Sequence, residues 1–211
     1  MQENKLRDHI CELGRSIFDR GLTHGSTGNI SARCEDGWLL TPTGSSLGRL
    51  DPSRLSKLDW NGKHLSGDPP SKENFLHLAM YQEQPRNQAV IHLHSTHSVA
   101  VSLLAGLDPH NLLPPLTAYY VMRIGTLPLV PYYAPGDLAL AEAVRGYAGR
   151  HHAMLLANHG PVVAGTNLSA AADAVEELEA TAKLYLLVQS HDVRPLTAAQ
   201  VAEIKRRSPS G

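Results

Sequence analysis

The sequence is poor in cysteine and has no long apolar run. Its 211 residues include two cysteines, Cys11 and Cys34, and neither belongs to a paired metal or redox motif. This usage excludes a disulfide framework and fits a reducing cytosol. No apolar stretch approaches the about 18 residues that cross a bilayer, and the amphipathic segment 1–20 has no signal-peptide core. We therefore expect a cytoplasmic protein without a membrane partner.

An excess of charge of either sign is also missing. The formal net charge is −1, from 19 basic and 20 acidic residues. Without a basic surface, nucleic acid is excluded as the expected partner, and an anionic small molecule has to be bound by local groups. With 42% hydrophobic and 18% charged residues the chain is typical of a globular protein. We expect a single domain over residues 1–211, with a polar C-terminal tail from about residue 191.

Helical and strand-like segments alternate along the chain without a break in composition. Apolar periodicity and turn residues predict helices over residues 3–20, 71–84, 95–104, 138–148, 169–189 and 198–206. They predict strands over residues 30–33, 38–41, 55–59, 89–94, 127–130, 153–157 and 162–164. Ser71 and Ser169 are the expected N-caps of their helices. Because tight turns join several strand pairs, an α/β fold with a mixed sheet and much antiparallel pairing is expected.

Histidine is abundant, with 12 residues, and three of them suggest a metal site. His92 and His94 end the predicted strand 89–94, where alternation of side chains puts both on one face. His159 follows another apolar strand and is the best candidate for a third ligand. Three protein ligands with an open position are typical of catalytic zinc. The alternative is that these are ordinary polar residues at strand ends, and His97 is a weaker candidate as a ligand or a supporting residue.

Small-residue loops offer groups for binding an anion. Backbone N–H groups, hydroxyls and one charge are presented with little bulk by Gly28, Asn29, Thr43, Gly44, Ser71 and Lys72. Together these groups could surround a phosphate. Each loop taken alone is common, and none matches a P-loop or a dinucleotide fingerprint.

Two kinds of residue could move a proton. Glu73 lies in the predicted first turn of a helix, where it could merely complement the helix dipole. If that turn faces the metal, Glu73 becomes a general acid–base or a displaceable fourth ligand. The phenol of Tyr119 or Tyr120 could donate a proton, although packing explains either residue equally well.

Taken together, these segments resemble the class II aldolase/adducin family, which includes fuculose-phosphate and ribulose-phosphate aldolases. The resemblance extends over about residues 6–189, and its motifs are Gly28-Asn29-Ile30-Ser31, Thr41-Pro42-Thr43-Gly44, Ser71-Lys72-Glu73, Val90 to His94 with Ser95 to Ala100, and Asn158-His159-Gly160-Pro161. It implies a three-layer α-β-α fold around a mixed, largely antiparallel sheet. It also implies a homotetramer with active sites between subunits.

The same resemblance implies roles for individual residues. One zinc ion per subunit would be held by His92, His94 and His159, with Glu73 as the acid–base. Phosphate binding is implied for Gly28, Asn29, Thr43, Gly44, Ser71 and residue 72. Tyr119 is the position matched to a proton-donating tyrosine from the neighbouring subunit, and Tyr120 is the alternative.

Lys72 departs from the aldolases of the family, which tend to have a second serine after Ser71. With this lysine, segments 70–73, 92–99, 117–122 and 132–136 look most like the 3-oxo-tetronate 4-phosphate decarboxylase branch. Decarboxylation and retro-aldol cleavage leave the same enediolate of dihydroxyacetone phosphate, which zinc can stabilise. We therefore expect a carbon–carbon lyase that converts this phosphorylated sugar acid to dihydroxyacetone phosphate and CO2.

Three alternatives remain open. The first is an aldolase that cleaves a ketose 1-phosphate such as fuculose or ribulose phosphate. A dehydratase of the methionine-salvage type is a weaker variant within the same family. The third belongs to another class of protein, a non-catalytic interaction module similar to adducin.

Overall fold

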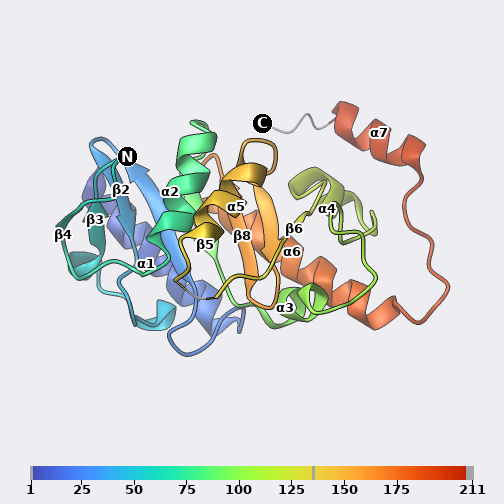
Figure 1. Cartoon of the computed structure of the whole chain (residues 1–211), viewed down its shortest axis with the longest axis horizontal. Helices are drawn as coiled ribbons and strands as arrows, with labels where there is room; N and C mark the ends of the chain where they lie inside the picture. Colours follow the sequence, from blue (N-terminus) through green and yellow to red (C-terminus); the bar gives the residue numbers. More distant parts are fainter. Residues whose placement is uncertain (1, 135, 208–211) are drawn as a thin grey trace.

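The computed structural model describes residues 2–134 and 136–207, and an eight-stranded sheet forms its centre (Figure 1). The strands are β1 (Asn29–Cys34), β2 (Gly37–Leu40), β3 (Ser56–Leu58), β4 (His64–Ser66), β5 (Ala89–His92), β6 (Leu129–Val130), β7 (Ala153–Leu156) and β8 (Gly160–Gly165). Their order across the sheet is β4-β3-β2-β1-β5-β8-β7-β6. Within the described part of the chain only β6 and β7 pair in parallel. The sheet is therefore mixed and largely antiparallel, as expected.

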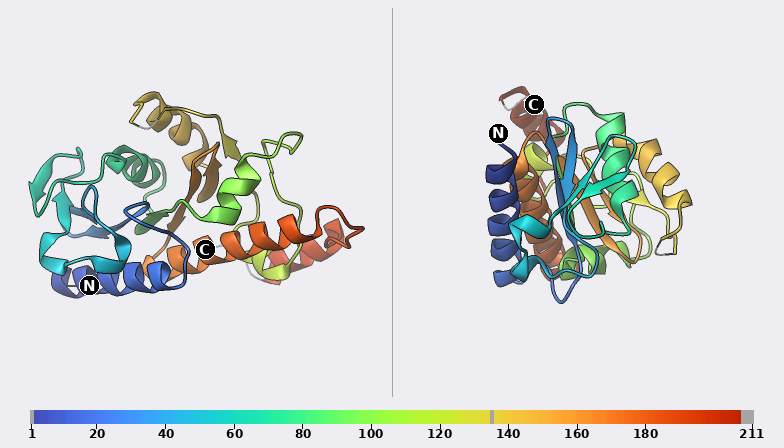
Figure 2. Two further views of the ribbon diagram at one scale, coloured as in Figure 1. Left: turned by 90° about the horizontal axis from the view of Figure 1, so that it is seen from below. Right: turned by 90° about the vertical axis from the view of Figure 1, so that its left-hand side faces the viewer.

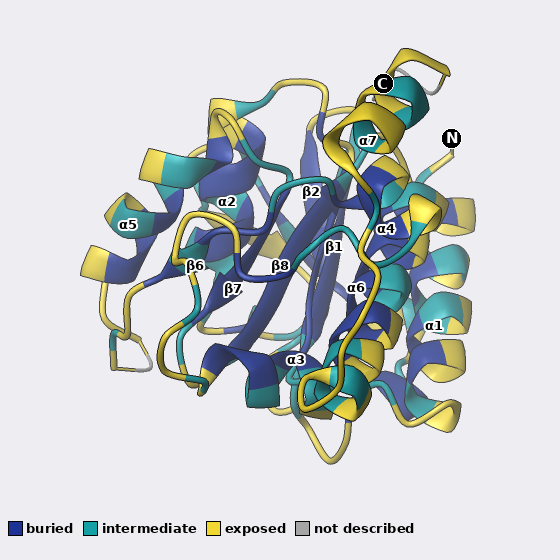
Figure 3. Cartoon of the chain, turned by 90° about the vertical axis from the view of Figure 1, so that its right-hand side faces the viewer, coloured by how far each residue is buried: buried dark blue, intermediate teal, exposed yellow. Residues whose placement is uncertain are grey.

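Helices cover both faces of the sheet. One face carries α1 (Glu3–Asp19) and α6 (Leu168–Val188), and the other carries α2 (Asn74–Glu83) and α5 (Ala139–Ala148), as the right-hand view of Figure 2 and Figure 3 show. Neighbouring strand residues divide between two cores, because Ile91 packs on the α1/α6 side and Val90 on the α2/α5 side. This confirms the predicted three-layer α-β-α arrangement.

Three further helices lie outside these two layers. They are α3 (Thr96–Ser102), α4 (Ala118–Arg123) and α7 (Ala198–Arg207), with two 3-10 turns at Leu47–Arg49 and Pro52–Arg54. α7 contacts α4 near one end of the molecule and has no buried residue (Figure 1). No helix in the described residues combines the length and apolar character needed to cross a bilayer.

Several predicted boundaries are wrong in an informative way. α2 begins at Asn74 with Glu73 at its N-cap position, so Ser71 is not the cap. The Asn167 side chain, rather than Ser169, caps α6 by accepting a hydrogen bond from the Ala170 N–H at 2.8 Å. β5 ends at His92 instead of residue 94.

Two elements were not predicted from the sequence. All three residues of β4 are exposed, so this strand has no apolar pattern to reveal it. α4 has six residues, and the Thr117 side chain caps it by accepting from the Tyr120 N–H at 3.0 Å. Such a short helix after a proline-rich segment leaves too little periodicity to be recognised.

Candidate metal centre and adjoining cavity

Three histidines and one glutamate converge at the end of β5. One ligand atom from each of Glu73, His92, His94 and His159 lies within 4.8 Å of all the others. The His92 and His159 Nε2 atoms are 3.3 Å apart, and the Glu73 carboxylate lies 3.0 Å from His159 Nε2 and 3.5 Å from His92 Nε2. The structure thus brings together all three predicted ligands and the predicted acid–base.

The backbone of β8 orients His92. Its imidazole is fully buried, and Nδ1 lies 2.8 Å from the Pro161 carbonyl oxygen. A carbonyl can only accept, so the proton sits on Nδ1 and the Nε2 lone pair faces the cluster. β5 ends at His92, but the buried Leu93 still bonds β8 through its N–H to the Pro161 oxygen at 3.2 Å. His92 and His94 both reach the cluster while Leu93 between them packs in the core, as side-chain alternation predicts.

His159 lies in the tight turn between β7 and β8. Asn158 has a φ of 58°, which is unusual for a residue other than glycine, and Gly160 has a φ of 152°. A Cβ at Gly160 would lie 2.1 Å from the Leu93 carbonyl oxygen. The turn therefore packs closely against the backbone of Leu93 and His94, and this contact sets the His94 and His159 side chains beside each other.

The electrostatics suit a divalent cation. Burial by itself would raise the pKa of Glu73, but the neighbouring His92 and His159 and the Asn29 hydrogen bond outweigh it and hold that pKa well below its usual range. Burial, aided by His92 and His159, lowers the pKa of His94 to about 4, and burial also lowers the pKa of His92. At neutral pH the carboxylate is ionised and these two imidazoles are neutral, which are the forms that bind a metal.

A cavity of about 340 Å³ opens beside the cluster. Its walls are formed by Ser26, Thr27, Gly28, Asn29, Pro42, Thr43, Gly44, Ser71, Lys72, Glu73, His94 and Gly136. All six residues predicted to bind phosphate are among them, together with Glu73 and one histidine of the cluster. At Gly28, whose φ is 81°, a Cβ would lie 3.0 Å from the His92 carbonyl oxygen, so the loop approaches β5 closely because it has no side chain there.

The tyrosines predicted as proton donors lie outside this cavity. Tyr119 is 60% exposed on α4 and does not line this cavity. Tyr120 is buried, and its hydroxyl has no hydrogen-bond partner within the described residues. Neither phenol is hydrogen-bonded to the cluster of Glu73 and the three histidines in the described residues.

His97 does not belong to the cluster. Its backbone N–H and its Nδ1 both bond the Glu179 carboxylate, at 2.9 and 2.7 Å. The same carboxylate accepts from the Ser98 N–H and hydroxyl, at 2.8 and 2.7 Å. Glu179 of α6 therefore satisfies the free N–H groups at the start of α3, and His97 has a structural partner instead of a metal.

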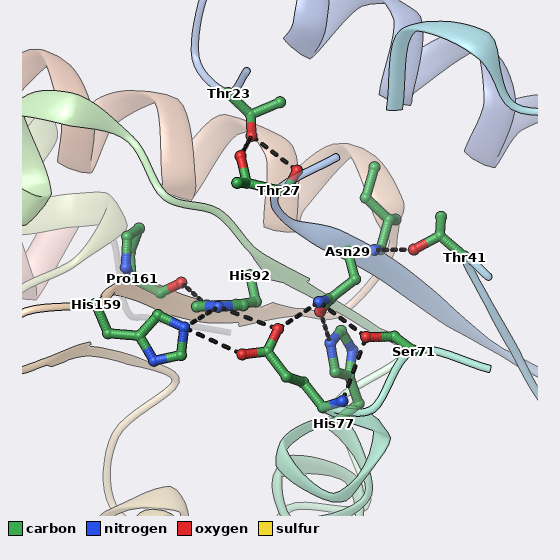
Figure 4. A network of polar contacts seen from close by, with 11 residues as sticks. Thr23, Thr27, Asn29, Thr41, Ser71, His77, His92, His159 and Pro161 are labelled. Atoms are coloured by element: carbon green, nitrogen blue, oxygen red, sulfur yellow. Dashed lines mark hydrogen bonds and ion pairs between the residues drawn. The ribbon is translucent and has the colours of Figure 1, made fainter. Parts of the chain in front are cut away.

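One buried residue of the site was missed from the sequence. His77 Nε2 lies 2.5 Å from Asn29 Oδ1 (Figure 4), and Asn29 Nδ2 donates to Glu73 at 2.8 Å. His77 follows Glu73 by four residues, which puts the two side chains on one side of α2. That spacing was the available signal.

Comparison with known proteins places this geometry in a family. Residues 8–186 match the family model of the class II aldolase and adducin N-terminal domain. A 3-oxo-tetronate 4-phosphate decarboxylase of Escherichia coli strain K12 is 52% identical over 204 residues, which cover 96% of each protein. An L-fuculose phosphate aldolase of the same strain is 37% identical over 188 residues, 88% of this chain and 85% of the aldolase.

A solved structure agrees with the sequence matches. The crystal structure of YgbL from Escherichia coli superposes with a TM-score of 0.95 at 50% identity, covering 97% of this chain and 100% of that one. Both the fold and the sequence are thus shared over nearly the whole length. The chain belongs to the class II aldolase/adducin family.

Proposed function

We propose that this protein is a carbon–carbon lyase that decarboxylates 3-oxo-tetronate 4-phosphate to dihydroxyacetone phosphate and CO2. The observation that carries the proposal is the cavity in which Lys72 and the phosphate-type loops lie beside the cluster of Glu73 and three histidines. The full-length similarity to a decarboxylase of that name supports this substrate. The substrate is thus a small phosphorylated sugar acid.

The protein residues would bind the two anionic ends of this substrate. Backbone N–H groups of Gly28 and Gly44 and the hydroxyls of Thr43 and Ser71 suit the phosphate, and Asn29 lies at the same wall with its side-chain amide bonded to Ser71 and Glu73. The exposed Lys72 ammonium lies at the same cavity and suits a carboxylate or adds charge beside the phosphate. Lys72 therefore favours a substrate that carries a second negative group.

The ion held by His92, His94 and His159 is proposed to be Zn²⁺, one per subunit. Three imidazoles with a carboxylate nearby form a donor set typical of catalytic zinc. When bound, such an ion supplies positive charge that stabilises negative charge developing on a substrate oxygen.

The reaction breaks the C1–C2 bond of the substrate. CO2 departs, and the electron pair stays on C2, conjugated with the C3 carbonyl, as an enediolate. A proton must then reach C2 to give dihydroxyacetone phosphate. The Glu73 carboxylate, at the cavity wall, can carry a proton only after taking one up, whereas the Tyr119 phenol carries one already.

We further propose a cytoplasmic homotetramer whose active sites lie between subunits, with no nucleic acid or membrane as partner. The exposure of Tyr119 on α4, outside its own cavity, supports delivery of this phenol to a neighbouring subunit. In that arrangement each active site takes Glu73 from one subunit and Tyr119 from its neighbour, so Tyr119→Phe and Glu73→Gln inactivate the site through different subunits. Subunits of the two variants, mixed and reassembled, should recover activity, whereas equal inactivity of mixture and parents would contradict the shared site.

The substrate assignment is tested with a panel of phosphorylated substrates. The zinc-loaded protein should release dihydroxyacetone phosphate and CO2 from 3-oxo-tetronate 4-phosphate, and little aldehyde from fuculose 1-phosphate or ribulose phosphate. Lys72→Ser should reduce the preference for the acid by lowering its kcat/KM. Aldehyde release with no turnover of the acid would instead establish an aldolase. The 37% identity to an L-fuculose phosphate aldolase is the reason for including this alternative. A protein that binds no metal by elemental analysis would favour the adducin-like alternative.

A further inference from the structure

A chain of hydrogen bonds passes from the core of the protein to Glu73. The Tyr81 hydroxyl lies 2.7 Å from Ser31 Oγ, which lies 2.6 Å from His77 Nδ1. His77 Nε2 lies 2.5 Å from Asn29 Oδ1, and Asn29 Nδ2 lies 2.8 Å from Glu73 Oε2. Tyr81, Ser31, His77 and Asn29 are all buried, and Figure 4 shows the end of the chain at His77 and Asn29.

Two elements with matching periods build this chain. Glu73, His77 and Tyr81 recur every four residues along α2 and its N-cap, so they form one stripe. Asn29 and Ser31 alternate along β1 and point to the same face of the sheet. The stripe of α2 lies against that face, which places each polar group opposite its partner.

The carboxylate of Glu73, at one end of this series of hydrogen bonds, fixes which group donates in each of them. The ionised Glu73 carboxylate can only accept, so Asn29 must turn its N–H toward it and its carbonyl toward His77. His77 Nε2 must then carry the proton. Burial, together with the nearby His92, lowers the pKa of His77 to about 3, so its ring is neutral and Nδ1 is bare. Ser31 therefore donates to Nδ1 and accepts in turn from Tyr81.

We propose that His77 is a positioning residue whose Nε2–H donates to the Asn29 carbonyl, with Ser31 donating to its Nδ1, and which thereby keeps the amide N–H of Asn29 facing Glu73. Without this restraint the Asn29 amide can rotate, and its carbonyl would then face the carboxylate and repel it. The consequence for turnover rests on the proposed acid–base role of Glu73. The tautomer and the amide orientation do not depend on that role.

The tautomer is measured first, because the measurement needs no substrate. Nitrogen-15 NMR of the folded protein distinguishes a protonated from a bare ring nitrogen for each histidine. His77 should show a protonated Nε2 and a bare Nδ1. In Ser31→Ala the bare Nδ1 loses its donor, so the other tautomer should become populated. A wild-type His77 protonated at Nδ1 would overturn the proposal.

Kinetics then tests positioning against mere packing. His77→Leu should lower kcat about tenfold to a hundredfold, as is usual for residues that support a ligand, with a smaller change in KM and unchanged metal content. His77→Gln keeps an N–H donor near the Asn29 carbonyl and should recover most of the rate. His152→Leu is the matched control, since His152 is another largely buried histidine, bonded at 2.8 Å to the Arg123 carbonyl away from the site.

A double-mutant comparison decides whether His77 acts through Glu73. In a Glu73→Gln background, His77→Leu should cause little further loss, because the carboxylate that it positions is already gone. Full additivity of the two losses, or no rescue by His77→Gln, would contradict positioning. If the wild-type protein instead fails to turn over 3-oxo-tetronate 4-phosphate, the proposed function is wrong while the NMR result still stands.

Discussion

At the level of single residues, Glu73 differs from its neighbours in how it is held. The His92 ring is fixed by the backbone, because its Nδ1 donates to the Pro161 carbonyl. Glu73 instead meets side chains, because Asn29 Nδ2 donates to it and His159 Nε2 lies 3.0 Å away. A carboxylate held only by side chains can shift from a metal toward a substrate, and can take up or release a proton, more easily than a side chain fixed by the backbone.

This difference predicts separate effects for two substitutions. Glu73→Gln should leave bound metal unchanged, because three histidine ligands remain, but should lower kcat about a hundredfold or more through loss of proton transfer. His94→Ala should lose metal and activity together. Elemental analysis alongside steady-state kinetics measures both quantities. Wild-type turnover by Glu73→Gln would remove its proton role.

The convergence of the three histidines and the cavity residues was predictable from the sequence. His92 and His94 were placed on one face by side-chain alternation, and both reach the cluster although β5 itself ends at His92. His159 and Glu73 needed the family resemblance, since nothing local links them to residues far along the chain. His77 was missed because the stripe of Glu73, His77 and Tyr81 becomes a hydrogen-bonded series only through its partners on β1, and the packing of β1 against α2 could not be predicted.

At the level of elements, the turn between β7 and β8 controls the site. Gly160→Ala would place a Cβ 2.1 Å from the Leu93 carbonyl oxygen in a backbone conformation that disfavours side chains. We expect a loss of about 1–3 kcal/mol in the free energy of unfolding and weaker metal binding, because His94 and His159 are both displaced. Urea unfolding and a metal titration measure these changes.

Gly146 is the matched control for this substitution. It lies within α5, and a Cβ there would have no neighbour within 4 Å. Gly146→Ala should raise the free energy of unfolding by about 0.5–1 kcal/mol through helix propensity. Equal effects at the two glycines would contradict the steric account of the turn.

Elements with long patterns were predicted best. α1, α5 and α6 were each placed within about two residues of their observed ends, because their apolar stripes face the sheet. The start of α2 was misplaced because Ser71 looks like a cap, whereas its hydroxyl in fact lies 3.3 Å from both the Glu73 N–H and Asn29 Nδ2. Ser71, a residue of the cavity wall, thus had the sequence pattern of a helix N-cap without occupying that position.

At the level of the whole molecule, the buried His77 makes stability depend on pH. Its pKa is about 3 in the folded protein, whereas a solvated histidine of the unfolded chain keeps the ordinary pKa of 6.5. On acidification the unfolded chain therefore binds a proton that the folded chain does not. Stability from this residue is complete above pH 6.5 and falls by up to about 1.4 kcal/mol per unit between pH 6.5 and 3.

Urea unfolding of the metal-free protein at pH 7, 6 and 5 measures this dependence. His92 and His94 also have lowered pKa values and contribute to the total slope. The comparison is therefore with His77→Gln, which lacks only the one titrating group and should show a shallower fall. Identical slopes would mean that His77 is protonated equally in the folded and unfolded states.

We propose that residues 1–211 form one domain, because the sheet is continuous from β4 to β6 and helices cover both of its faces. Residues 1, 135 and 208–211 lie outside the described residues of this expected domain.

The order of strands in the sheet has a consequence for how the protein is made. β1 to β4 and β5 leave the ribosome early, but β8, which borders β5, begins only at Gly160. His92 and His94 therefore emerge long before His159, and the Pro161 carbonyl that orients His92 arrives later still. The three histidines can therefore come together only after residue 159 has been synthesised, so any metal that needs all three of them binds after that point.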